Sequence, residues 1–199
     1  LQQPISGQLD RSDVSAMATG TSNIHFQYDA KEDRLRLVFG GGDTPWRALL
    51  LTRRLTLRMV RGFATLLARH GRQDWPTIGA TRADALAYEH LAATASPGPL
   101  VPPASSAPDS APPKSIPAGQ EYLVSHIDIQ PGEERFGLVF FGHDLQLLRI
   151  RPAREEFHRL LATLLNLAGR AQWDISVQDT WLTSVENLRQ AGNRGAALH

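Results

Sequence analysis

Two histidines and an aspartate in the second half of the chain have the residue types of a metal or general-base site. His126 and Asp128 are two positions apart in a segment that alternates polar and apolar residues, so a strand would point both side chains to one face, and His143 follows nearby. No His-Glu-x-x-His or comparable ligand spacing accompanies them. The polar face of an exposed strand explains these residues better. We therefore predict no metal ion, no cofactor and no catalytic residue.

Glycine and serine motifs add no chemistry to this. Gly40-Gly41-Gly42-Asp43 follows an apolar run and could cradle a phosphate with its backbone amides, but no Lys-Ser or Lys-Thr comes after it. The nucleophile pattern Gly-x-Ser-x-Gly is absent. The sequence favours a tight turn at the glycines and identifies no nucleophile.

Arginines gather on a segment with helical periodicity between Arg53 and His70. They fall close to one stripe opposite the apolar face, and the set is Arg54, Arg58, Arg61, Arg69 and Arg72. Such a stripe is a candidate surface for a partner or an anion, and its alternative is a solvated helix face. Residues 1–95 hold 12 basic and 9 acidic side chains, whereas residues 96–199 hold 9 and 11, so the basic character belongs to the first half.

Four aromatic residues on expected strands suggest a second binding chemistry. Phe26, Tyr28, Phe136 and Phe141 could stack on bases, with Arg34, Arg36 and Arg58 meeting phosphates. Aromatic residues make up only 7% of the chain, and a core needs most of them. Single-stranded nucleic-acid binding is therefore an alternative and not the leading hypothesis.

The composition limits the remaining classes. The chain has 199 residues, no cysteine and a formal net charge of +1, which excludes thiol chemistry and gives no global field for nucleic acid or an anionic membrane. No apolar run is long enough to span a membrane, and the first 21 residues lack a signal-peptide pattern. We expect a soluble, cytoplasmic protein.

A proline-rich segment divides the chain. Residues 95–119 contain eight prolines among Ala and Ser, with hardly any large apolar side chain, which is typical of a semi-rigid linker. A linker of this kind predicts a module on each side. The expected organisation is a polar tail over residues 1–21, a first module over 22–94, the linker, and a second module over 120–199.

The two modules resemble each other in sequence. A shift of 101 positions aligns Ile24–Asp43 with Ser125–Asp144 without a gap, matching His25 with His126 and Leu37-Val38-Phe39 with Leu138-Val139-Phe140. The shift then shortens from 101 to 98 positions, a change that we expect between the last strand and the first helix. At a shift of 98, Ala64-Thr65-Leu66-Leu67 aligns with Ala162-Thr163-Leu164-Leu165. At this spacing most of the arginine stripe has no counterpart. The agreement predicts an internal duplication whose copies have diverged in charge.

Each module is expected to fold as β-β-β-α-α. A hairpin (25–39 in the first copy) is followed by a strand at 46–52 or 145–151, a helix ending near Gly71 or Gly169, and a second helix. Thr81 and Asp84 have the spacing of a capping box at the start of the second helix of the first copy. One such unit is marginal in size, so we expect the copies to pack as an intramolecular pseudo-dimer.

These observations predict an α+β protein made of a tandem duplication of the β-β-β-α-α module. The leading functional hypothesis is a non-enzymatic protein-interaction or assembly subunit with a protein partner, and homo-oligomerisation is compatible with it. Single-stranded nucleic-acid binding is the first alternative. A metal- or His-dependent enzyme acting through His126, Asp128 and His143 is the second.

Overall fold

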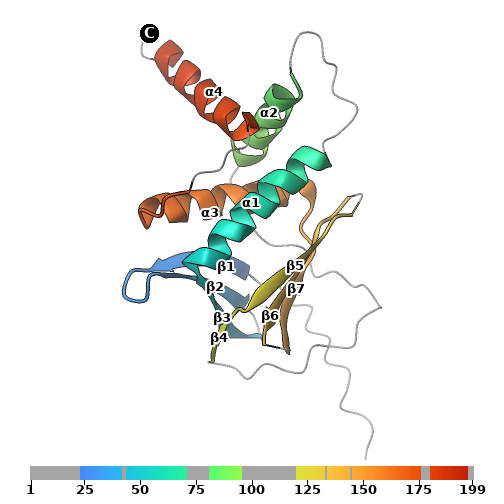
Figure 1. Ribbon diagram of the computed structural model, residues 1–199, viewed down its shortest axis with the longest axis vertical. Helices are drawn as coiled ribbons and strands as arrows, with labels where there is room; N and C mark the ends of the chain where they lie inside the picture. Colours follow the sequence, from blue (N-terminus) through green and yellow to red (C-terminus); the bar gives the residue numbers. More distant parts are fainter. Residues whose placement is uncertain are drawn as a thin grey trace, which may run out of the picture.

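The computed structural model describes residues 23–41, 44–70, 81–95, 120–132, 134–143, 145–175 and 180–196. They form a mixed α+β structure with a four-stranded sheet, a three-stranded sheet and four helices (Figure 1). The predicted tail over residues 1–21 lies outside the described residues, as does the predicted linker apart from residue 95. No helix among the described residues is long and apolar enough to cross a membrane.

The first half contains the expected hairpin, third strand and two helices. β1 (Asn23–Asp29), β2 (Arg34–Gly41) and β3 (Thr44–Thr52) are antiparallel neighbours, and α1 (Arg53–Arg69) and α2 (Arg82–Ala95) follow. Alternation places Leu35 and Leu37 on the buried face of β2. The capping box is confirmed, because Thr81 N–H donates to Asp84 Oδ2 (3.1 Å) and Asp84 N–H donates to Thr81 Oγ1 (3.2 Å).

The second half repeats this order of elements. β5 (His126–Gln130), β6 (Gly137–Gly142) and β7 (Leu145–Ile150) form an antiparallel sheet, followed by α3 (Arg154–Arg170) and α4 (Thr180–Ala196). α3 ends at Arg170, one residue after Gly169, near which the sequence predicts its end. Gly71 lies outside the described residues. The β2–β3 and β6–β7 pairs both shift register at one place, after Phe39 and after Phe140.

A short strand that the sequence pattern did not predict joins the two sheets. β4 (Glu121–Leu123) pairs in parallel with β3, and the chain then passes directly into β5. Val124 N–H donates to Leu50 O in the first sheet (2.9 Å), whereas Ser125 N–H donates to Phe141 O in the second (2.7 Å). The first sheet is thus completed by residues from beyond the expected module boundary at 120. A parallel pairing between segments so far apart in sequence leaves no local signal.

The helices show where the spacing between the two halves changes. α1 and α3 both have 17 residues and start at Arg53 and Arg154, a spacing of 101, whereas α2 and α4 start at Arg82 and Thr180, a spacing of 98. The spacing between helix starts therefore changes after the first helix of each half, whereas the sequence alignment changes it before that helix. Spacings of 101 and 98 both align leucine-rich stretches of the two helices, so the sequence alone does not distinguish the two spacings. Burial favours the spacing of 101, because five aligned positions are then buried in both helices: Thr56 and Phe157, Met59 and Leu160, Val60 and Leu161, Phe63 and Leu164, and Leu67 and Ala168.

One hydrophobic core is shared by both halves. α1 and α3 contact each other between the sheets and the α2–α4 pair, as Figure 1 shows. Phe157 of α3 lies against Phe63 of α1, with ring centroids 4.3 Å apart. α3 also contacts β1, and a Cβ added at Gly62 of α1 would lie 3.3 Å from Ile129 Cδ1 of β5. Each first helix therefore reaches the sheet of the other half.

Candidate functional site

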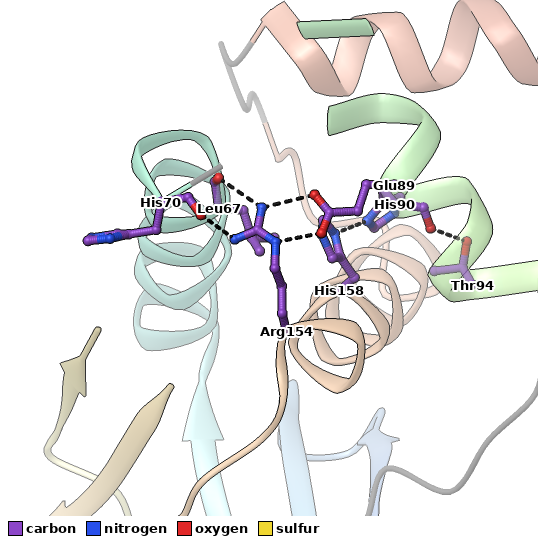
Figure 2. Close-up of polar contacts among 7 residues, drawn as sticks. All are labelled: Leu67, His70, Glu89, His90, Thr94, Arg154 and His158. Carbon is purple, nitrogen blue, oxygen red and sulfur yellow. Dashed lines mark hydrogen bonds and ion pairs between the residues drawn. The ribbon is translucent and has the colours of Figure 1, made fainter. Parts of the chain in front are cut away.

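A partly buried ionic contact joins the two halves where three helices meet. Arg154, at the start of α3, donates through Nε to Glu89 Oε1 (2.5 Å) and through Nη2 to Glu89 Oε2 (3.0 Å), as Figure 2 shows. The Arg154 and Glu89 side chains are only 17% and 15% exposed. A two-pronged guanidinium–carboxylate contact with so little water around it fixes α2 against α3 in one geometry.

The same guanidinium also caps α1. Arg154 Nη1 donates to the carbonyl of His70 (2.7 Å) and Nη2 to that of Leu67 (3.3 Å). The last carbonyls of a helix have no partner within the helix and carry partial negative charge, so a cation there is favourable. Arg154 thus holds the end of α1, the middle of α2 and the start of α3 together.

Two histidines extend this contact into the interior. His90 and His158 are 2% and 0% exposed, and their Nδ1 atoms are 3.1 Å apart, close enough for one N–H to donate to the other ring (Figure 2). His158 Nε2 lies 3.6 Å from Glu89 Oε1. The ring of Trp181, from α4, meets His90 edge-on at a centroid distance of 5.5 Å. We call Glu89, His90, Arg154 and His158 the clamp.

Charge in the clamp is balanced internally. Burial raises the pKa of Glu89, but the neighbouring His158 and Arg154 side chains outweigh that effect and lower the pKa to about 2, from an ordinary value of 4.5. Glu89 is therefore ionised at neutral pH and neutralises Arg154. Both histidines are almost fully buried, and the contacts of the clamp join α1, α2 and α3.

Sequence reasoning did not identify the clamp. Arg154 and His158 are four residues apart on one helix and Glu89 and His90 are adjacent on another, and nothing in the sequence connects residues 65 positions apart. The only sign of the clamp in the sequence is a helix face on which ionisable residues lie next to apolar ones, which is rare. Such a face identifies a partner only after the fold has placed the two helices together.

A second link between the halves involves the first hairpin. Asp33 Oδ1 accepts hydrogen bonds from Trp173 Nε1 (2.7 Å) and from the Tyr28 hydroxyl (2.9 Å). These two hydrogen bonds lower the pKa of Asp33. Asp33 has a φ of 50°, a conformation that Asp tolerates better than most residues. The turn between β1 and β2 is thereby fastened to the residues that follow α3.

The three candidate metal or base residues lie on or beside the second sheet. His126 stacks on Phe141 with centroids 4.6 Å apart and approaches Ser125 Oγ with its Nδ1 at 3.1 Å. Asp128 is exposed opposite Val139, and His143 is exposed in the β6–β7 turn. Among the described residues no three His, Asp or Glu side chains lie close enough to hold a metal ion. The structure does not bring the three into one coordination sphere.

The candidate stacking residues differ in how accessible they are. Phe136 is 2% exposed and stacks on Phe157, so it is part of the core. Phe26 is partly buried against the same core, and Tyr28 is engaged with Asp33 and meets the Trp173 ring edge-on. Phe141 is partly buried beneath His126. Of the four, Phe136 is therefore core, while Phe26, Tyr28 and Phe141 are partly buried.

The predicted arginines lie on the solvent side of α1. Arg54, Arg58, Arg61 and Arg69 are exposed, and Arg72 falls outside the described residues. None of the four exposed side chains makes an ion pair or hydrogen bond with another described residue.

Comparison of the chain with protein-family models, curated proteins and solved structures found no match.

Proposed function

We propose that this protein is a non-enzymatic interaction or assembly subunit built from two diverged copies of a β-β-β-α-α module. The observation that carries the proposal is the clamp. It uses buried and partly buried ionisable groups to hold the halves together, while Arg54, Arg58, Arg61 and Arg69 of α1 are exposed and have no ion-pair partner among the described residues. A rigid body with an unneutralised outer surface is suited to holding a partner.

Three features support a duplication that packs as a pseudo-dimer. The order of the elements is the same in both halves, the first helices have equal length, and their buried positions correspond at one spacing. α1 and α3 each pack toward the sheet of the other half, as in an isologous pair of subunits. The copies would have diverged where only one forms a contact: Leu57 takes the place of His158 at spacing 101.

Co-purification of the tagged protein from its native host, followed by identification of bound protein and nucleic acid, tests the function. A protein recovered in constant proportion supports the proposal. Recovery of nucleic acid alone, lost at high salt, favours single-stranded nucleic-acid binding instead. Stoichiometric metal in the purified protein would favour an enzyme that uses His126, Asp128 and His143.

Limited proteolysis tests the pseudo-dimer. Cleavage between residues 95 and 119 should leave two fragments that co-elute in gel filtration, because the clamp and the shared core do not depend on that connection. Fragments that separate and remain folded would contradict the docked arrangement.

A further inference from the structure

The outer side of α1 has a row of arginines with no acidic partner among the described residues. Arg54, Arg58 and Arg61 are at positions i, i+4 and i+7 of one helix, so their side chains project to the same side, and Arg69 continues the row toward the end of the helix. The distance from residue 54 to residue 69 along the axis is about 22 Å at ~1.5 Å per residue. We call these four residues the arginine face.

Repulsion between neighbouring arginines of the arginine face destabilises α1. α1 has no acidic residue in its first turn, where negative charge is favourable. Each like-charge pair at i, i+4 destabilises a helix by about 0.2–0.5 kcal/mol. Among the described residues no acidic side chain pairs with these arginines, and only Arg69, in the last turn, is favourably placed for the helix dipole.

In the corresponding helix of the second half, a carboxylate pairs with one of the arginines. At spacing 101 Arg58 corresponds to Arg159, which forms an i, i+4 ion pair with Glu155, and Glu155 itself occupies the position of Arg54. Arg61 corresponds to Ala162. α3 thus pairs an arginine at the position of Arg58 with a carboxylate at the position of Arg54, whereas among the described residues α1 has no such pair.

The spacing favours an acidic protein segment over nucleic acid as the ligand. Carboxylates one helical turn apart match arginines at i, i+4 and i+7, and each guanidinium can donate two N–H groups to one carboxylate. Single-stranded nucleic acid needs aromatic rings among the cations for stacking. The one aromatic residue of α1, Phe63, is fully buried.

We propose that the arginine face of α1 binds an acidic segment of a partner protein. This inference rests on the proposed interaction function and gives it a place on the molecule and a ligand chemistry. The bound segment would supply the carboxylates that α1 lacks and that Glu155 supplies in α3.

Binding of a fluorescent oligoglutamate peptide as long as α1 tests the proposal by anisotropy at low salt. The test variant is Arg54→Gln/Arg58→Gln/Arg61→Gln. The matched control is Lys31→Gln/Arg151→Gln/Arg170→Gln, which removes the same charge from exposed positions elsewhere. A peptide with glutamine at every glutamate and an oligothymidylate of equal length complete the set.

The full-length protein should bind the acidic peptide, and the test variant should bind it at least tenfold more weakly. The control should stay within about twofold, and binding should weaken as salt rises. Equal affinity in the test variant, an equal loss in the control, absence of binding, or tighter binding of the oligothymidylate would each overturn the proposal. A co-purified partner that the test variant still retains would overturn this site but leave the interaction function standing.

Discussion

Replacement of Glu89 tests the clamp most directly. Glu89→Gln keeps the size of the side chain and one acceptor but removes the charge that neutralises Arg154. The shift of the Glu89 pKa from 4.5 to about 2 corresponds to about 3 kcal/mol at ~1.4 kcal/mol per pKa unit. The pair is partly screened because both side chains keep some exposure, so we expect a loss of about 2 kcal/mol in the free energy of unfolding. This lowers Tm by about 4–8 °C for a chain of this size.

The loss should depend on pH in a defined direction. The folded-state pKa lies below the unfolded-state value, so the stabilisation is present above about pH 4.5 and is lost as the pH falls toward 2. Glu89→Gln does not titrate at this position. The difference between wild type and variant should therefore be largest near neutral pH and should shrink below pH 4.5.

Urea unfolding followed by tryptophan fluorescence measures these free energies, since Trp181 packs against the clamp histidines. Arg154→Gln and the double variant complete a double-mutant cycle, which isolates the Glu89–Arg154 interaction from the loss of each side chain. Additive effects of the two substitutions, or a loss for Glu89→Gln that stays constant from pH 7 to pH 3, would refute the view that this ion pair joins the halves.

Other substitutions probe the remaining features. Phe157→Ala should cost about 3–5 kcal/mol in urea unfolding, because the ring is fully buried between two other phenylalanines; a loss below ~1 kcal/mol would contradict the shared core. His90→Leu should cost about 1–3 kcal/mol by leaving His158 Nδ1 unpaired, and adding His158→Leu should cost less than the sum of the two single losses; strict additivity would argue against the contact. Asp84→Ala should cost about 1 kcal/mol and reduce helical circular dichroism by freeing the first turn of α2, whereas Tyr88→Ala on the exposed side of the same helix should cost less than half of that.

Local patterns predicted most of the secondary structure. The hairpin over β1 and β2 follows from strand alternation around a polar turn, α1 and α3 follow from apolar residues at helical spacing, and the capping box of α2 follows from Thr81 and Asp84. These features depend on interactions within a few residues. Composition and charge also located the arginine face, since exposure on a helix follows from its periodicity.

Long-range placement could not be read from the sequence. β4 pairs with β3 although more than half of the first module and the segment after it separate the two strands in the sequence. Glu89 contacts Arg154 although they are 65 positions apart. The sequence alignment changes spacing before the first helices, whereas α1 and α3 start 101 residues apart and α2 and α4 start 98 apart, because several registers of a leucine-rich helix align equally well. Only the buried faces of α1 and α3 separate these registers.

The sequence by itself determined the α+β class, the order of strands and helices apart from β4, and the basic outer side of α1, because each of these follows from short-range periodicity and residue type. The tertiary structure alone decided which ionisable residues are buried together, which sheet each helix reaches, and which aromatic rings are core. Those outcomes depend on the packing of elements distant in the chain, where desolvation makes an ion pair such as Glu89–Arg154 form in one geometry only.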